Sequence, residues 1–355
     1  MSTSRIAVNG LGRIGRSFFR LAHAHPELSL VAVNDLGDKE NLAYLLKHDS
    51  VYGRSAFDVT VAPKGEPALL IDGRSVAFLS ERDPKKLPWG ALNIDIVVES
   101  TGFFASYEKA SAHLKAGAKR VVITAPAEGA DGGSAEGGSA EDALGATVLV
   151  GINEEKLETC RISSNASCTT NAASPPVQIL HEAIGIEKAI LNTTHAYTAT
   201  QSLVDSPVGK DFRRGRAAAH NIIPSTTGAA LATTEAITAL KGKFDGVALR
   251  VPVVAGSIVD ITFIAKRPTS KEEVNAILKQ AAGQVRWQSV FSVTEEPIVS
   301  SDIIGSPYAS VADLSMTCVV DGTLVKVLAW YDNEMGYANA LLQHVLAASR
   351  HLSSL

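Results

Sequence analysis

Gly10-Leu-Gly-Arg-Ile-Gly15 follows the short apolar run Ile6–Val8 and opens a helical pattern over Ile14–Ala24. A strand, a glycine-rich turn and a helix in this order are typical of a dinucleotide-binding βαβ unit. Gly10 permits the tight turn, Gly12 lets the backbone approach a pyrophosphate, and Gly15 allows close packing of the helix on the strand. The unpaired N–H groups at the positive end of the helix attract phosphates. This stretch therefore predicts a dinucleotide-binding fold.

Asp35 follows the second predicted strand, Leu30–Val33, twenty residues after Gly15. A carboxylate at this place accepts hydrogen bonds from the ribose hydroxyls of a bound dinucleotide. It also repels the 2′-phosphate that distinguishes NADP from NAD. We therefore predict NAD as the cofactor, and a loop or cap residue without a ligand is the alternative interpretation of Asp35.

Apolar and helical segments alternate through the N-terminal part of the chain, with strands expected at Ile94–Val98 and Val121–Thr124 and a helix at Tyr107–Ala116. Such alternation is typical of parallel βαβ units. From Ile186 onward, alternating polarity suggests a mixed or antiparallel sheet with one face covered by helices. Its strands are expected at Ala189–Thr194, Ala248–Val253, Ile258–Ala265 and Val325–Tyr331.

Two domains are expected from these patterns and from the length of 355 residues, which exceeds the usual size of one hydrophobic core. We predict the α/β class, with a doubly wound parallel sheet of the Rossmann type over residues 1–165. An α+β catalytic domain with a mixed or antiparallel sheet is expected over 166–333, and a C-terminal helix over 334–355 that packs back on the first domain. The pentapeptide Gly-Gly-Ser-Ala-Glu occurs twice within 127–143, which predicts a low-complexity surface loop there.

The overall composition excludes several classes of protein. A formal net charge of −4 argues against a general polyanion-binding surface, so we expect no specific nucleic-acid binding. Three cysteines do not make a disulfide framework, and we expect Cys160 and Cys318 to be buried and inert. The first residues lack a secretory signal, and no apolar run approaches the roughly 20 residues of a membrane span. We therefore expect a cytoplasmic protein without a membrane partner and without a metal site.

Cys168 lies in Ser167-Cys-Thr-Thr-Asn171, just before a helical pattern that runs through Val177–Ile184. A cysteine at the start of a helix has its thiolate, the reactive form, stabilised by the helix dipole and by unpaired N–H groups. Cys168 is therefore a candidate nucleophile. His195 ends a predicted strand and could reach Cys168 only through the fold, and a lone histidine is more often structural than catalytic.

Longer motifs occur in order along nearly the whole chain. They are Asn9-Gly-Leu-Gly-Arg-Ile-Gly-Arg16, Asn34-Asp35, Glu99-Ser-Thr-Gly102, Ala166-Ser-Cys-Thr-Thr-Asn171, Thr194-His-Ala-Tyr-Thr-Ala-Thr-Gln201, Asn221-Ile-Ile-Pro-Ser-Thr-Thr-Gly-Ala-Ala230, Arg250-Val-Pro252 and Trp330-Tyr-Asp-Asn-Glu-Met-Gly-Tyr337. Together they closely resemble the motifs of phosphorylating glyceraldehyde-3-phosphate dehydrogenases.

The resemblance implies roles for residues at matching positions. Cys168 is implied to be the nucleophile and His195 the general base that activates it. The implied NAD-binding residues are Gly10, Gly12, Gly15, the backbone of Arg13 and Ile14, Asp35, Arg82, Thr124 and Asn333. Two anion sites, one for the substrate phosphate and one for inorganic phosphate, are implied at Ser167, Thr169, Thr198, Arg214, Thr227, Gly228 and Arg250.

Arg214 belongs to a basic cluster with Lys210, Arg213 and Arg216. A solvated basic loop is one interpretation of this cluster. A phosphate site is the other, because a guanidinium offers a fixed fork that matches phosphate oxygens. For Arg250, a structural ion pair stays open as an alternative.

The implied activity is the NAD-dependent, phosphorylating oxidation of D-glyceraldehyde 3-phosphate to 1,3-bisphosphoglycerate through a thioester on Cys168. Glyceraldehyde 3-phosphate and inorganic phosphate are the implied partners, and a homotetramer with residues 197–222 at a subunit interface is the implied assembly. Two alternatives stay open: an erythrose-4-phosphate dehydrogenase, and a catalytically idle NAD-binding scaffold. The presence of Cys168, His195 and both anion sites favours an enzyme over a scaffold.

Overall fold

The computed structural model describes residues 3–127, 145–209 and 211–352. Lys210 and, apart from Ala127, the predicted insertion at 127–143 lie outside these ranges. The chain divides into two compact units. The first contains the described residues up to Val148, Asn153–Ala166 and those from Leu341 onward, and the second contains Leu149–Ile152 and the described part of Ser167–Ala340.

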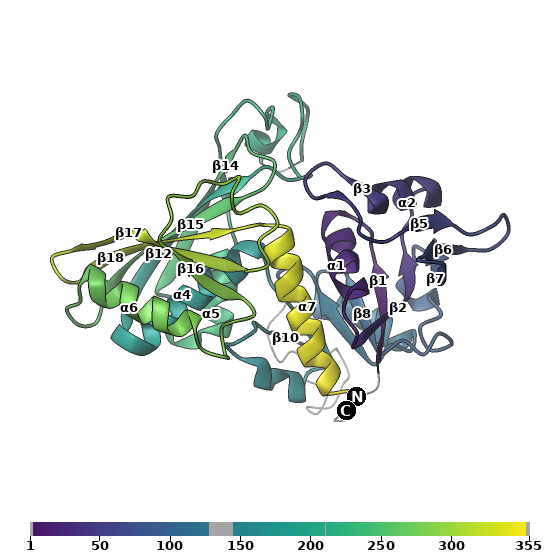
Figure 1. Ribbon diagram of the computed structural model, residues 1–355, viewed down its shortest axis with the longest axis horizontal. Coiled ribbons are helices and arrows are strands. Elements are labelled where there is room, and N and C mark those ends of the chain that lie inside the picture. Colours follow the sequence, from purple (N-terminus) through teal and green to yellow (C-terminus); the bar gives the residue numbers. More distant parts are fainter. Residues whose placement is uncertain (1–2, 128–144, 210, 353–355) are drawn as a thin grey trace. The chain divides into compact units, whose positions relative to one another are not determined.

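The first unit is built on a nine-stranded sheet in the order β10-β11-β9-β8-β1-β2-β7-β6-β5 (Figure 1). Neighbours from β10 to β7 are parallel, and β7, β6 and β5 are antiparallel. The strands are β1 (Ser4–Asn9), β2 (Leu28–Asn34), β5 (Val59–Val61), β6 (Ala68–Ile71), β7 (Arg74–Leu79), β8 (Ile96–Glu99), β9 (Arg120–Ile123), β10 (Gly145–Thr147) and β11 (Ile162–Ser164), with a separate hairpin of β3 (His48–Asp49) and β4 (Gly53–Arg54). The helices are α1 (Arg13–His23), α2 (Lys39–Lys47), α3 (Tyr107–Lys115) and the short 3₁₀ turns Pro84–Lys86 and Glu154–Glu158.

Both faces of this sheet are covered, which is why its strands are nearly continuous apolar runs. Ile6 and Val8 of β1 pack with Phe18 of α1 in one cluster, whereas Ala7 between them belongs to a cluster on the other face with Trp89. The predicted doubly wound parallel sheet is confirmed.

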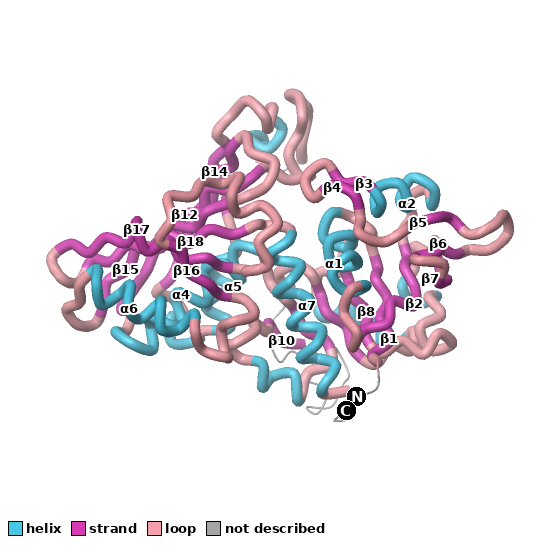
Figure 2. The backbone as a smooth tube through the Cα atoms, in the orientation of Figure 1, coloured by secondary structure: helices cyan, strands magenta, loops and turns pink. Residues whose placement is uncertain are grey.

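The second unit contains a seven-stranded mixed sheet in the order β13-β14-β12-β15-β18-β17-β16 (Figure 2). The pairs β12·β14 and β16·β17 are parallel and the others are antiparallel, so the predicted mixed sheet is also confirmed. The strands are β12 (Ile186–Ala196), β13 (Ile223–Thr226), β14 (Phe244–Val251), β15 (Ser257–Ala265), β16 (Phe291–Thr294), β17 (Ser310–Val320) and β18 (Leu324–Tyr331). The helices are α4 (Cys168–Ile184), α5 (Ala229–Ala236), α6 (Lys271–Ala282) and the 3₁₀ turns Phe212–Gly215 and Thr238–Leu240.

Alternate residues of β15 are buried, and they form one core with α4 and α6. The last helix, α7 (Met335–Arg350), ends in the first unit, where Leu341, Val345 and Leu346 join the cluster that contains α1.

The expectation that Cys318 is buried is wrong, because its side chain is exposed, whereas Cys160 is buried as expected. The register of β17 against β18 shifts between Asp313 and Cys318. After this shift, Cys318 lies on the exposed face of the strand. Counting residues along an alternating strand cannot foresee such an irregularity.

Candidate active site

A cavity of about 520 Å³ lies at the carboxyl ends of β1, β2 and β8 in the first unit. The order of the sheet reverses at β1, with β2 on one side and β8 on the other. Ligands of doubly wound sheets bind at this switch point. The cavity is lined by Asn9, Gly10, Gly12, Asn34, Asp35, Leu36, Glu81, Arg82, Pro84, Leu87, Ser100, Thr101, Phe103 and Phe104.

Gly10 and Gly15 of the first motif are required by the backbone geometry, and Gly12 leaves space beside the cavity. Gly10 has a φ of +99°, which L side chains rarely adopt. A Cβ added to Gly15 would lie 2.0 Å from the carbonyl oxygen of Gly10, so only glycine allows this contact between helix and turn. A Cβ added to Gly12 would meet no described atom within 4 Å, and Gly12 lines the cavity. A ligand can therefore reach the backbone at the start of α1, as a pyrophosphate requires.

Both oxygens of the Asp35 carboxylate accept hydrogen bonds from backbone N–H groups. Oδ2 accepts a hydrogen bond from Leu11 N at 2.7 Å, and Oδ1 accepts one from Gly37 N at 2.8 Å. A carboxylate offers about four acceptor positions. Asp35 is therefore fixed at the edge of the cavity while it can still accept bonds from ribose hydroxyls.

The remaining predicted cofactor residues of the first unit are placed differently. Arg82 lines the cavity. The side chain of Arg13 binds Asp49, with Nη1 2.7 Å from Oδ2, so the backbone of Arg13 is the part that can serve a phosphate. Thr124 follows β9, where its N–H donates to Glu99 O, and it is not among the residues that line the cavity.

Sequence reasoning gave no role to several lining residues, among them Asn9, Asn34 and Thr101. All three stand at or just after the carboxyl end of a parallel strand. Polar residues at this position were the signal that could have identified them, because the carboxyl ends of the strands form the ligand crevice.

In the second unit, Cys168 is the first residue of α4. Ser167 caps the helix, since its Oγ accepts a hydrogen bond from Thr170 N at 3.1 Å. Ala166 precedes the cap with a φ of +51°, an uncommon conformation for alanine, which places the nucleophile after a strained turn. Pro175 and Pro176 lie in the middle of the helix, which continues to Ile184 although neither residue has an N–H to donate.

The fold brings His195 of β12 to Cys168. Sγ of Cys168 lies 3.3 Å from Nε2 of His195, and Nδ1 of His195 lies 2.6 Å from the carbonyl oxygen of Ala196. A proton on Nδ1 that is donated to Ala196 O leaves Nε2 free to accept the proton of the thiol. This is the geometry of a nucleophile and its base.

Arg250 lies opposite His195 on the neighbouring strand β14. Its Nη1 is 2.6 Å from His195 Nδ1 and 3.2 Å from Ala196 O. Because a guanidinium has only donors, its partner here is the carbonyl of Ala196, and its charge opposes a second charge on the imidazole. Burial and then Arg250 lower the pKa of His195 to about 3.

Burial raises the pKa of the Cys168 thiol, and Arg250 and the hydrogen bonds of Thr169 only partly oppose this rise. Burial therefore opposes the stabilisation of the thiolate that the start of the helix provides. Nε2 of His195 lies within hydrogen-bond reach of Sγ of Cys168, so it can take the proton of the thiol.

Thr169 joins a buried hydroxyl network beside this pair. Its Oγ1 lies 2.9 Å from the hydroxyl of Tyr331, which lies 2.8 Å from Oγ1 of Thr193. The Tyr331 ring meets the His195 ring edge-on at 5.9 Å. Burial raises the pKa of Tyr331, so this residue stays a neutral hydroxyl that packs the imidazole in place.

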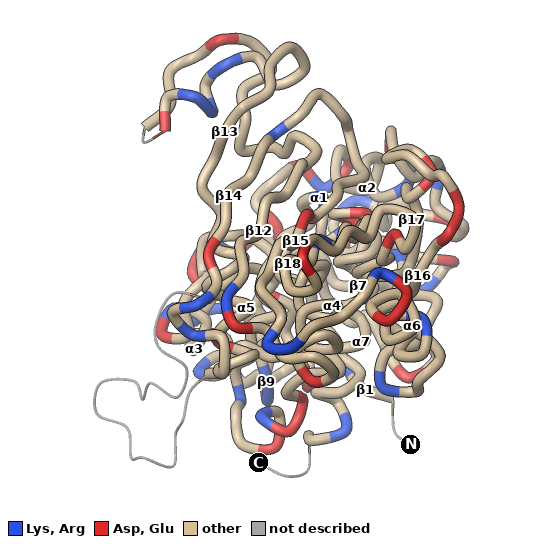
Figure 3. Tube along the Cα trace, turned by 90° about the vertical axis from the view of Figure 1, so that its left-hand side faces the viewer, with Lys and Arg blue, Asp and Glu red and all other residues tan. Residues whose placement is uncertain are grey.

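The arginines of the basic cluster differ in their partners, which are carboxylates for some and a hydroxyl for another. Arg213 pairs with Asp211 and Arg216 with Asp205, so acidic and basic residues lie together in this segment (Figure 3). Arg214 instead donates from Nε and Nη2 to the hydroxyl of Ser225, which leaves its charge uncompensated by this partner.

Burial lowers the pKa of Arg250, and the charge of Arg214 lowers it further. The positive charges of the two guanidinium groups are therefore felt in the same region of the second unit. Two such groups without a carboxylate between them favour a bound anion. The alternative of a structural ion pair for Arg250 finds no support among the described residues, where no carboxylate bridges to it.

The other predicted anion-site residues lie on loops of the second unit. Thr198 Oγ1 is 3.0 Å from Thr200 Oγ1, and Thr227 Oγ1 accepts a hydrogen bond from Ala229 N. Gly228 is the exposed residue before α5. The register of β13 places Ile223 opposite Arg250, so Thr227 lies several residues further along the sheet. Arg214 is bound to Ser225 of β13, two residues before Thr227, whereas Cys168, His195 and Arg250 are joined by direct contacts.

Asn333 follows β18 in the second unit and is buried. Its Oδ1 accepts hydrogen bonds from Gly256 N and from Ser257 Oγ, and Ser257 Oγ accepts one from Ala196 N. Asn333 is therefore fixed to the same backbone that holds His195.

Known proteins with similar sequences agree with these features. Glyceraldehyde-3-phosphate dehydrogenase 2 of Streptomyces avermitilis is 46% identical to this chain over 343 residues, which are 96% of the chain and 97% of the relative. This chain belongs to the glyceraldehyde 3-phosphate dehydrogenase family. Glyceraldehyde-3-phosphate dehydrogenases of Geobacillus stearothermophilus and Clostridium pasteurianum are each 44% identical to it, over 95% and 96% of the chain and 96% and 97% of their own lengths.

The two domains of the family match separate parts of the chain. The NAD binding domain of glyceraldehyde 3-phosphate dehydrogenase matches residues 4–107, and the C-terminal domain matches 167–333. The first match contains β1, β2 and β8, whose ends form the cavity, and the second contains Cys168 and His195. The predicted family and the predicted cofactor NAD are therefore confirmed.

The described part of this glyceraldehyde 3-phosphate dehydrogenase family member contains no group of three or more His, Cys, Asp or Glu placed to hold a metal ion. Among the helices that the structure describes, none combines the length and hydropathy of a membrane span.

Proposed function

We propose that this chain catalyses the NAD-dependent, phosphorylating oxidation of D-glyceraldehyde 3-phosphate to 1,3-bisphosphoglycerate. The observation that carries the proposal is the pair formed by Cys168 Sγ and His195 Nε2 at 3.3 Å, with the cation Arg250 beside it. A scaffold that only binds NAD has no chemical use for this arrangement.

The reaction begins with proton transfer from Cys168 Sγ to His195 Nε2. The thiolate adds to the aldehyde carbon, so a C–S bond forms and the carbonyl electron pair moves to oxygen, which gives a hemithioacetal. The imidazolium of His195 and the N–H at the start of α4 stabilise this oxyanion. The chemistry supplied by bound NAD is acceptance of the hydride that leaves the hemithioacetal carbon, and a thioester on Cys168 remains.

Inorganic phosphate completes the reaction by attack of one oxygen on the acyl carbon. The C–S bond breaks, 1,3-bisphosphoglycerate is released, and the thiol is restored when His195 returns its proton to sulfur. The proton of the attacking phosphate passes to solvent, so one proton is released in each turnover. Arg250 and Arg214 are the charges that attract the two phosphate groups, and Ser167, Thr169, Thr198, Thr227 and Gly228 are assigned to the same sites by the resemblance.

The cofactor residues act in the first unit and at Asn333. Gly10, Gly12 and Gly15, with the backbone of Arg13 and Ile14, hold the pyrophosphate at the start of α1. Asp35 accepts hydrogen bonds from the ribose hydroxyls, and Arg82, which lines the cavity, contacts the adenosine half. Thr124 is assigned to the same half by the resemblance alone. Asn333 holds the carboxamide of the nicotinamide. The preference for NAD over NADP is supported by the fixed charge of Asp35.

We assign the working enzyme to a homotetramer in the cytoplasm. Leu203, Val204, Phe212 and Ile222 are large apolar side chains exposed in the segment 197–222, which supports a subunit interface there. Cys160, Cys168 and Cys318 form no disulfide within the described part of the chain, which suits a reducing compartment. Sedimentation of the active enzyme as a monomer would contradict the assembly.

The test is NADH formation by the purified enzyme with glyceraldehyde 3-phosphate and NAD, with phosphate present and absent. The expected result is turnover that depends on phosphate. The same assay with erythrose 4-phosphate and with NADP separates the related dehydrogenase and the other cofactor. Preference for the four-carbon aldehyde would overturn the substrate assignment, and no turnover with either aldehyde would favour the scaffold.

A further inference from the structure

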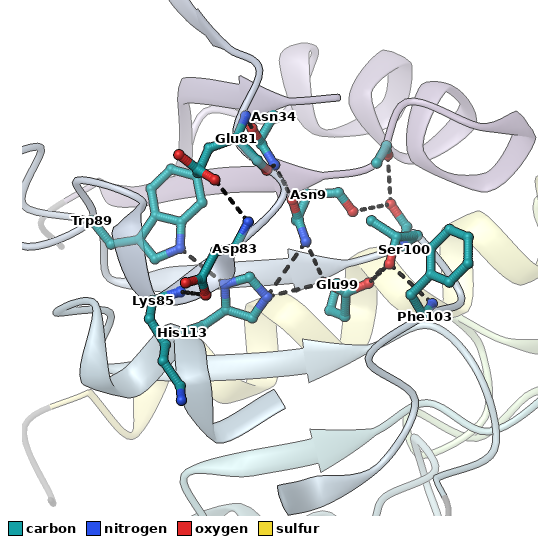
Figure 4. Close-up of polar contacts among 12 residues, drawn as sticks. Asn9, Asn34, Glu81, Asp83, Lys85, Trp89, Glu99, Ser100, Phe103 and His113 are labelled. Atoms are coloured by element: carbon teal, nitrogen blue, oxygen red, sulfur yellow. Dashed lines mark hydrogen bonds and ion pairs between the residues drawn. The ribbon is translucent and has the colours of Figure 1, made fainter. Parts of the chain in front are cut away.

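Behind the lining of the cavity, a chain of hydrogen bonds joins buried polar side chains of the first unit (Figure 4). We propose that Trp89, His113 and Glu99 form a positioning relay that fixes both walls of the NAD cavity. The inference rests on the proposed binding of NAD in this cavity and adds residues that do not touch the cofactor.

The direction of the relay is set by Trp89. The indole Nε1 can only donate, and it lies 3.0 Å from Nδ1 of His113, which must therefore accept. The imidazole proton is then on Nε2, which donates to Oε2 of Glu99 at 3.0 Å. Trp89 is fully buried, and so are the side chains of His113 and Glu99, so water cannot replace these bonds.

Glu99 collects four donors on its two oxygens. Oε2 accepts from His113 Nε2 and from Asn9 Nδ2, and Oε1 accepts from both N and Oγ1 of Thr101. Asn9 Nδ2 and His113 Nε2 are 3.5 Å apart, as expected for two donors that share one acceptor. The carboxylate is thus saturated, and each donor has only one orientation open to it.

One wall of the cavity is fixed through Thr101. Because its hydroxyl proton is used by Glu99, Oγ1 acts as the acceptor for Phe103 N at 3.1 Å. Ser100 next to it donates its hydroxyl to Gly10 O at 2.6 Å, which ties this wall to the glycine turn. Phe103 and Thr101 both line the cavity.

The other wall is fixed through Asn9. With its amide nitrogen on Glu99, its Oδ1 accepts from Asn34 Nδ2 at 2.7 Å. Asn34 then holds Glu81 on both sides, by donating to Glu81 O and by accepting from Glu81 N. Glu81 stands directly before Arg82 on the rim of the cavity. Glu99, which His113 and Trp89 hold from behind, therefore binds one residue of each wall, Thr101 and Asn9.

Packing alone does not require this arrangement. A buried carboxylate costs desolvation energy, and an apolar residue of similar volume is often at least as stabilising. Three of the four hydrogen bonds that Glu99 accepts come from Asn9 and Thr101, which line the cavity, whereas His113 and Trp89 are not among the lining residues. The polar relay therefore serves the shape of the ligand site.

The experiment compares NAD binding by calorimetry in the full-length enzyme and four variants. Trp89→Phe removes the donor that sets the His113 tautomer and keeps an aromatic ring, and Glu99→Gln replaces an acceptor by a donor. Thr101→Val removes the hydroxyl, and Thr101→Ser restores it. We expect Kd for NAD to rise about tenfold, which corresponds to about 1.4 kcal/mol, in all variants except Thr101→Ser.

Val122→Ala is the matched control, because Val122 is fully buried in the same unit and does not line the cavity. It should lower Tm and leave Kd for NAD unchanged. The rate at which iodoacetamide alkylates Cys168 in the absence of NAD should be unchanged in every variant, since Cys168 belongs to the second unit.

Unchanged Kd in Trp89→Phe and Thr101→Val, together with a fall in Tm like that of the control, would overturn the relay and leave a purely structural network. Failure of the wild-type enzyme to bind NAD would overturn the proposed function first. If Glu99→Gln does not fold, the comparison of Thr101→Val with Thr101→Ser still tests the relay.

Discussion

Two buried histidines should make this protein lose stability in acid, and His344 is the one that can be removed without touching the catalytic pair. Its ring is fully buried in α7, with Nε2 2.7 Å from Ser163 Oγ and Nδ1 3.1 Å from Asn165 Oδ1. Burial and then the charge of Arg120 lower the pKa of His344 from 6.5 to about 3. The perturbation is His344→Asn, which has no group that gains a proton in this range.

The magnitude follows from proton linkage. Below pH 6.5, His344 of the unfolded chain binds a proton, whereas His344 of the folded chain stays neutral until the pH approaches 3. The free energy of unfolding therefore falls as the pH falls from 6.5 toward 3. A lowering from 6.5 to about 3 costs about 2 kcal/mol at pH 5 for His344. His195, whose pKa is lowered by a similar amount, adds a second loss of about 2 kcal/mol.

The assay is urea unfolding of wild type and His344→Asn at neutral pH and at pH 5. His344→Asn should be less stable at neutral pH, because it loses the bond from Ser163. Between the two pH values, however, the variant should lose about 2 kcal/mol less than the wild type. An equal loss in both proteins would refute the claim that the folded state keeps His344 neutral.

Three further changes test the site. Cys168→Ser should lower dehydrogenase activity by orders of magnitude while NAD still binds, because a hydroxyl has a much higher pKa than a thiol; near-normal turnover would end the mechanism. His195→Asn should slow acylation by about 10²- to 10⁴-fold and shift the alkylation of Cys168 to higher pH, and an unchanged pH profile would exclude thiol activation by His195. Asp35→Asn should reduce the preference for NAD over NADP, measured as the ratio of kcat/KM values, because the charge that repels a 2′-phosphate is gone; an unchanged ratio would place the discrimination elsewhere.

Much of the first unit could be predicted from the sequence because its signals are local. The glycines at 10 and 15 have backbone reasons that can be read from one turn, Gly12 leaves that turn open to the cavity, and Asp35 has a fixed distance along the chain from it. The strand at Ile6–Val8 and the helix from Ile14 were predicted to within a few residues, because apolar residues repeat with the period of each element.

The catalytic pair required more than local signals. Cys168 and His195 are twenty-seven residues apart, and only the packing of α4 against the mixed sheet brings them together, so the resemblance rather than spacing identified His195. The raised pKa of the Cys168 thiol was beyond the sequence as well, because it follows from the burial of the side chain in the fold. The relay from Trp89 to Asn34 was equally hidden, because its members come from separate strands and helices.

The most direct test of the central claim is the mass of the enzyme after one turnover without phosphate. Purified enzyme is mixed with NAD and glyceraldehyde 3-phosphate, quenched in acid and digested. We predict one phosphoglyceroyl group on the peptide that contains Cys168, formed together with a burst of NADH and removed when phosphate is added. Normal phosphate-dependent turnover without this adduct and without the burst would contradict a thioester on Cys168.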